Sequence, residues 1–218
     1  MNNGLLGAVE SIIEASQKKF FGVAVGIVSD VLDPLGQGRV KVRLPWFNES
    51  EETGWARIAT PSAGLLYGFY FIPKPNDEVL VAFEHGDIEQ PYVLGRLWNL
   101  QDTPPEFSPL LGKSHIRTLV GHDLEFDDLQ QSIKITTSTF QKITLDPLKI
   151  EMTNLAGTVT LTLDNATQSI KLQAAVGIEL KATDIKIQGV NVEISGAAKT
   201  EVKSGALCNV QAPLVKIN

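Results

Sequence analysis

The sequence predicts an all-β protein of two parts, a small barrel followed by a long repetitive segment that becomes stable only as an oligomer. Apolar and polar residues alternate with period 2 from residue 133 onward, as in strands with one buried and one wet face. All three Trp, all three Tyr and eight of nine Phe precede residue 130, which marks a boundary between the parts. Residues 141–218 contain no aromatic side chain.

The repetitive segment therefore lacks the large side chains that usually fill the ~10 Å between the sheets of a sandwich. Small and β-branched residues suit a narrow prism, in which strands from several chains wrap about one axis. A single chain would leave its apolar stripe in water, so we expect an obligate oligomer, most simply a three-fold intertwined β-helix. The predicted trimer core is Ile143, Leu145, Leu161, Leu163, Ile170, Leu172, Ile178, Leu180, Ile185, Ile187, Val190, Val192 and Ile194.

Composition excludes several classes of function. The chain has 218 residues, 43% of them hydrophobic, and a net charge of −6, which indicates a globular protein. No basic cluster exceeds the pair Lys18-Lys19, so no nucleic acid partner is expected. The single cysteine, Cys208, is interpreted as a small buried hydrophobe. The sequence shows neither a membrane span nor a signal peptide, so we expect assembly in the cytoplasm.

The first element is a short amphipathic helix over residues 1–19, because apolar residues recur there at helical spacing. Its apolar stripe either packs on the following domain or docks on a partner, and the sequence leaves both interpretations open. The stripe consists of Leu5, Leu6, Val9, Ile12 and Ile13.

The barrel is predicted over residues 20–99, where the pattern changes to short strands with close turns. Residues 20–46 contain two strands joined by a polar turn, and residues 78–97 form a hairpin around His85-Gly86-Asp87. Five strands in about eighty residues favour a small closed barrel. Residues 100–115 then form a proline-containing linker, and residues 116–218 form the repetitive segment.

Several strings carry a resemblance to a known family. They are GQGRVKVRLPW at 36–46, WARIATPSAG at 55–64 and FIPKPNDEVLVAFEHGDIEQPYVLGRLWN at 71–99. In this order they resemble the OB-fold barrel of the baseplate assembly protein V family, the central spikes of contractile phage tails. The spikes of type VI secretion and extracellular contractile injection systems are similar. GHDLEFDD at 121–128 resembles the segment that begins the trimeric β-helix of that family; beyond it, only the character of the sequence matches.

The resemblance implies a structural, non-enzymatic role. A homotrimer would dock its OB barrels beneath a ring-shaped hub, among other baseplate proteins, and its β-helix would be a needle driven through the target membrane. Some spikes carry a lysozyme domain between barrel and needle, but the short linker here leaves no room for one. About twenty residues precede the barrel, so the hub is expected to be a separate protein. Whether the particle is a phage tail or a bacterial injection system stays open.

The C-terminal end predicts a further partner. Some spikes of this kind end in a His-x-His motif that binds iron, but the last residues here contain no histidine. A prism ending in apolar residues would expose three unpaired strand edges. The resemblance therefore implies a separate conical tip protein, similar to the proline-alanine-alanine-arginine repeat tips. Its expected binding residues are Leu214, Val215, Ile217 and Asn218.

No catalytic, cofactor or metal site is predicted. None of the histidines stands at ligand spacing from another histidine or cysteine, so surface or hydrogen-bonding roles are expected. Glu125 and Asp127 share one face of a strand, which favours a solvated face or a salt bridge over a glycosidase pair. The histidines are His85, His115 and His122.

Two other functions remain as alternatives. One is a trimeric fibre or adhesin whose OB domain recognises a glycan, with Trp46 and Trp55 serving either as barrel core or as a stacking platform. The other is an enzyme that degrades cell-wall polymer. A fibre would be expected to end in an exposed aromatic head, whereas this chain ends in aliphatic strands.

Overall fold

The computed structural model describes residues 19–105 and 112–216, and these divide into two units at residues 115/116. The described residues are all-β, with one short 3-10 turn, η1 (Glu84–Gly86), between strands. The amphipathic helix predicted for residues 1–19 lies almost entirely outside them. Within the described ranges, no helix has the length and apolar character needed to cross a bilayer.

The first unit is built on a six-stranded sheet with the order β3-β2-β1-β7-β8-β4, antiparallel except for the β4–β8 pair. Beyond the strand ends, Val40 and Ala56 exchange two backbone hydrogen bonds of 3.0 and 2.7 Å, which curl the sheet into a barrel. This arrangement agrees with the predicted OB fold. The strands are β1 (Val23–Asp30), β2 (Lys41–Leu44), β3 (Asn48–Glu52), β4 (Arg57–Ile58), β7 (Glu78–Phe83) and β8 (Pro91–Arg96).

The core of this barrel is aliphatic. Alternate residues of β7 are buried, as the period of a strand with one inner face requires. The two tryptophans considered for the core lie outside it: Trp46 is 46% exposed and packs on Phe20, with ring centroids 4.7 Å apart. Trp55 is half-buried beneath the cations of Arg39 and Lys41. The buried core comprises Ala24, Val28, Val40, Val42, Leu44, Ala56, Val79, Val81, Phe83 and Val93.

Gly26 of β1 lets the neighbouring strand approach closely. A Cβ added there would lie 2.3 Å from Cγ1 of Val42, so Gly26→Ala is expected to lower the stability of the barrel by about 1–3 kcal/mol. Gly95 of β8 is the matched control, because its added Cβ meets nothing within 4 Å. Thermal unfolding followed by Trp fluorescence tests the pair; equal midpoints for the two variants would contradict this packing.

The β1–β2 turn is organised by one carboxylate. Asp33 accepts hydrogen bonds from the backbone N–H groups of Leu35, Gln37 and Arg39, and pairs with the Arg39 guanidinium at 2.7 Å. The guanidinium, together with these backbone donors, holds the pKa of Asp33 well below its ordinary range. The predicted polar turn is therefore a rigid, charge-assisted loop.

This lowered pKa gives the turn a pH-dependent contribution to stability. Because the folded-state pKa is depressed, the contribution is complete above the unfolded value of about 3.9 and is lost as the pH falls toward the folded value. Asp33→Asn is expected to lower the denaturant midpoint at neutral pH, and the gap to the parent should shrink steadily below pH ~4. A gap that is constant with pH would show that the Asp33 carboxylate does not stabilise the turn through its charge.

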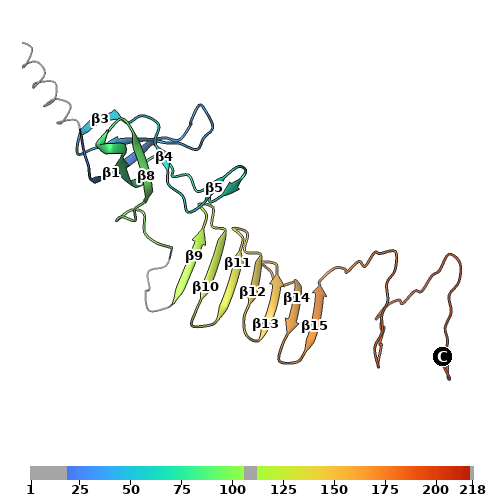
Figure 1. The fold of residues 1–218 in the computed structure, drawn as a ribbon. Coiled ribbons are helices and arrows are strands. Elements are labelled where there is room, and N and C mark those ends of the chain that lie inside the picture. The colour runs from blue at the N-terminus through green and yellow to red at the C-terminus, as the bar shows by residue number, and fades with distance from the viewer. Residues whose placement is uncertain (1–18, 106–111, 217–218) are drawn as a thin grey trace, which may run out of the picture. The chain divides into compact units, whose positions relative to one another are not determined.

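A separate hairpin, β5 (Ala63–Gly64) and β6 (Tyr67–Gly68), projects from the first unit (Figure 1). It pairs Ala63 with Gly68 and Gly64 with Tyr67 and does not join the barrel sheet. The five strands expected over residues 20–99 do not include this hairpin as a separate element.

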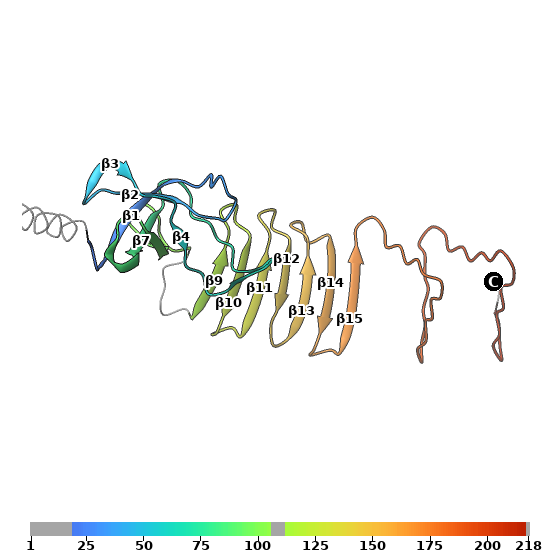
Figure 2. The ribbon, with the colours of Figure 1, turned by 45° about the horizontal axis from the view of Figure 1, so that its top comes forward.

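The remaining strands form one antiparallel meander in which each strand pairs with its neighbours in the chain. Both ribbon views show them side by side in a single layer (Figures 1 and 2). The strands are β9 (Lys113–Arg117), β10 (Asp123–Asp127), β11 (Ser132–Thr136), β12 (Lys142–Leu145), β13 (Lys149–Thr153), β14 (Val159–Asp164) and β15 (Ser169–Ala174).

The chain beyond β15 differs from the sequence prediction. Strands were expected around residues 178–194, 210 and 215, but residues 175–216 contain no strand. Figure 1 draws them as extended chain in orange to red. Cys208, expected to be buried, is exposed here. The physical reason is that a strand needs a neighbour, and no other segment within the described residues pairs with this one.

Candidate functional site

The register of β10–β15 arranges apolar side chains in two continuous rows across six strands. Within each row, every residue is the direct cross-strand partner of the next, and such pairs stabilise a sheet. The first row is Leu124, Ile135, Ile143, Met152, Leu161 and Leu172. The second row is Phe126, Ile133, Leu145, Ile150, Leu163 and Ile170. We call these twelve residues the apolar face.

The apolar face is uncovered in the single chain. Eight of its twelve side chains are at least 36% exposed, and Ile170 near the outer edge reaches 74%. The sheet is a single layer, so its two faces have no second sheet packed against them in the described part of this unit (Figure 2). Monomeric proteins rarely expose a contiguous apolar patch of this extent, which identifies the face as an interaction surface.

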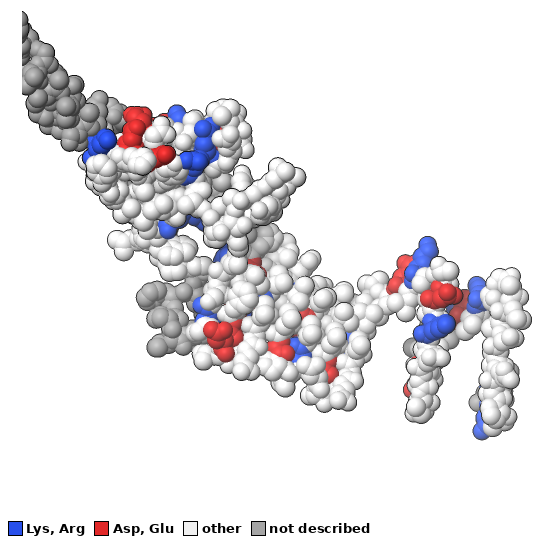
Figure 3. Space-filling view, in the orientation of Figure 1, with Lys and Arg blue, Asp and Glu red and all other residues white. Residues whose placement is uncertain are grey.

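The opposite face of the sheet is polar. Lys134 Nζ lies 3.0 Å from Oε1 of Glu125 on the neighbouring strand, and Lys149 Nζ lies 3.1 Å from Oε2 of Glu151. Glu125 and Asp127 therefore lie on the polar face, as expected, while Phe126 points to the other side. The charges of this unit appear as small separate patches in Figure 3. The ion-paired side chains of this face are partly exposed and can meet water, whereas Asp127 is only 3% exposed and accepts a hydrogen bond of 2.9 Å from the backbone N–H of Gln130.

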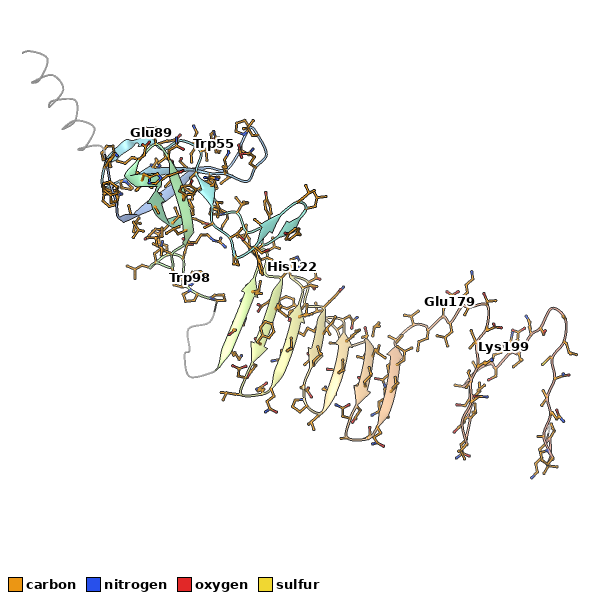
Figure 4. The ribbon with its side chains drawn as sticks, viewed as in Figure 1. Trp55, Glu89, Trp98, His122, Glu179 and Lys199 are labelled. Atoms are coloured by element: carbon orange, nitrogen blue, oxygen red, sulfur yellow. The ribbon has the colours of Figure 1, made fainter. Side chains whose placement is uncertain are left out.

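The structure brings together only some of the predicted core residues. Six of them, in β12, β14 and β15, lie on the apolar face. The other seven, between Ile178 and Ile194, lie in the extended segment, where no pairing aligns them; Figure 4 shows Glu179 of this segment beyond the sheet. The prediction omitted Leu124, Phe126, Ile133, Ile135, Ile150 and Met152, although the same alternation runs through them.

The predicted tip-binding residues are only partly described. Leu214 and Val215 are exposed in the extended segment, and Ile217 and Asn218 lie outside the described residues. The role of all four in binding a tip protein stays a prediction.

The histidines hold no arrangement typical of catalysis. The Nδ1 atom of His122, at the turn after β9 (Figure 4), accepts a hydrogen bond of 3.2 Å from the backbone N–H of Ser138. His115, Asp123 and Glu125 hold possible ligand atoms within 4.8 Å of one another, a grouping that sequence spacing did not indicate. Because the Lys134 ammonium already pairs with Glu125, a metal ion at this place would have to compete with it.

Comparison with known proteins addresses the barrel. The sequence pattern of the type VI secretion system/phage-baseplate injector OB domain matches residues 24–98. Residues 24–98 therefore carry the OB domain found in phage-baseplate and type VI secretion injectors. The match spans β1 to β8 and leaves the seven-stranded sheet outside it.

Individual proteins also match this chain over about ninety residues. The chain is 36% identical over 94 residues to the actin cross-linking toxin VgrG1 of Vibrio cholerae, covering 38% of this chain and 9% of the relative. It is 36% identical over 93 residues to the type VI secretion system spike protein VgrG2a of Pseudomonas aeruginosa. This match covers 38% of this chain and 11% of the relative. The chain thus spans about a tenth of the length of these relatives.

Proposed function

We propose that the protein is the homotrimeric, non-enzymatic central spike of a contractile tail or injection machine. The observation that carries the proposal is the uncovered apolar face of the seven-stranded sheet. The match of the barrel to the injector OB domain supports the same role, since the relatives that match over a similar length include proteins named as spikes.

In the proposed trimer, three copies of the sheet turn their apolar faces toward one axis. The two rows of side chains then fill the interior of a narrow prism, and the polar faces with their ion pairs meet water. Eleven of the twelve side chains carry no aromatic ring, Phe126 of β10 being the exception, and this suits an interior in which three sheets closing on one axis leave little room for large rings. Seven strands at ~4.8 Å per strand give a first section of the needle about 30 Å long.

The extended segment 175–216 is proposed to form a second section with a different construction. Its backbone N–H and C=O groups need hydrogen-bond partners once they leave water. The outer edge of β15 is unpaired within the described chain, and it continues directly into this segment. We therefore infer that the segments of three copies pair with one another, so that Ile178, Val192 and their neighbours turn inward only in the assembly.

The proposed partners follow from this arrangement. A hub protein would bind the OB barrels, other baseplate proteins would surround them, and a conical tip protein would cover the C-terminal residues Leu214–Asn218. The needle would contact the target membrane only transiently. No nucleic acid partner is proposed. The particle would assemble in the cytoplasm.

The first test is the mass of the purified protein by light scattering. A trimer of about 71 kDa, three times the chain mass of 23.7 kDa, supports the proposal. A folded monomer would contradict it, because the apolar face would then be stable in water without a partner.

A further inference from the structure

The hairpin β5–β6 presents an unusually apolar tip. Leu65 and Leu66 are 89% and 98% exposed, and Tyr67, Phe69, Tyr70 and Phe71 beside them are at least half exposed. Residues 61–73 carry no charged side chain, and the projecting hairpin is white in Figure 3. Thirteen uncharged, largely apolar residues on a projection identify a contact surface rather than a solvated loop.

The hairpin is held in one conformation. The Tyr67 ring lies across Gly64, where an added Cβ would be 2.2 Å from the ring, and Phe69 N–H donates to the Ser62 carbonyl at 3.0 Å. Leu66 at the tip has φ +62°, a backbone conformation that is unfavourable for a residue with a Cβ. The backbone of Leu66 is therefore held in an unfavourable conformation while Leu65 and Leu66 point outward. Such local strain is typical of functional contacts.

A groove of about 880 Å³ lies between the hairpin and the barrel of the same unit, and residues 61–73 form about half of its lining. It is large enough to hold apolar side chains from a partner. Its lining includes Ile58, Tyr70 and Ile72, with Gln37 among the residues that border it.

The guanidinium groups that line this groove are already engaged. Arg39 pairs with Asp33, Arg57 bonds the hydroxyl of Tyr92, and Arg96 pairs with Asp77. Two of the three guanidinium groups are thus paired with carboxylates, and the groove offers mainly apolar surface to an occupant.

We propose that the hairpin tip of one copy inserts into the groove of the next copy around the three-fold axis. The inference rests on the proposed trimer and adds an interface between the barrels. One unit carries both the projection and the groove, so a head-to-tail contact can repeat and close into a ring. The exposed hairpin residues present on the order of 800 Å² of accessible surface per copy. Each partner in a standard stable interface buries about the same area.

Cross-linking between differently tagged chains tests the contact. In a Cys208→Ser background, one tagged chain carries Leu65→Cys and the other carries Gln37→Cys, and the two are co-expressed as the full-length protein. A short bismaleimide is expected to join the two tags in the trimer. Leu65→Cys with Glu89→Cys is the matched control, because Glu89 is exposed outside the groove.

The outcomes separate this inference from the proposed function. Light scattering first establishes whether the variants are trimers. If the variants are trimers but Leu65→Cys cross-links to Gln37→Cys no better than to Glu89→Cys, the hairpin contact alone is overturned. If the variants are monomers, both proposals are overturned. A second readout is the maleimide reactivity of Leu65→Cys in the trimer, expected to be at least about tenfold slower than that of Glu89→Cys because interface cores exclude water. Equal reactivity would also overturn the contact and would favour a separate ligand or partner for the hairpin.

Discussion

Leu161→Asp is expected to abolish the trimer, whereas Thr160→Asp is expected to leave it intact. Leu161 lies on the apolar face between Met152 and Leu172, so the substitution would bring three carboxylates together in the interior of the prism. Burying unpaired charge costs several kcal/mol per group, which exceeds the roughly 1.5–3 kcal/mol that burial of one leucine side chain contributes. Light scattering and migration in unheated SDS gels measure how much of the protein remains trimeric.

Thr160→Asp is the matched control in the same strand. Thr160 points to the opposite face, and its cross-strand partners Thr153 and Gln173 are uncharged. Its effect on stability is therefore expected to stay within ~0.5 kcal/mol, as for other surface substitutions. If both variants assemble equally, or if Thr160→Asp alone dissociates, the assignment of the inner face is wrong.

Amide hydrogens of residues 175–216 are expected to exchange at least ~100-fold more slowly in the assembled protein than in an unstructured chain. The segment has no strand pairing inside one chain, so strong protection can come only from pairing between copies. Hydrogen exchange read by mass spectrometry on peptic peptides gives the protection segment by segment.

The Leu161→Asp variant provides the control for exchange. In that monomer, residues 175–216 should exchange at the rate of an unstructured chain, while the barrel strands stay protected. If residues 175–216 stay protected in the monomer, the segment pairs within its own chain. If they exchange rapidly in the trimer, the segment does not form the second section of the needle.

Much of the barrel and of the apolar face was predictable because both depend on local patterns. The alternation along β7 and the glycine-containing turns predict short strands. The strings from residue 36 to 99 resemble the family that the comparison confirms. In the sheet, Ile143, Leu145, Leu161 and Leu163 share one face, as alternation along each strand requires, since a period of two residues depends only on the strand itself.

The hairpin β5–β6 was missed because its strands are only two residues long. Alternation needs four or more residues to show, and here the glycines and the tip conformation of Leu66 define the element. The groove beside it combines residues from Gly36 to Arg96, so no local pattern indicates it.

The sequence by itself determined that the second half of the chain is made of strands with one apolar face, and that the face needs cover. Only the tertiary structure decided which strands find partners inside one chain: β9–β15 pair in a meander that ends at Ala174, and residues 175–216 find none. The physical reason is that a period of two specifies which side chains share a face, whereas the hydrogen bonds of a strand depend on a neighbour chosen by the fold as a whole.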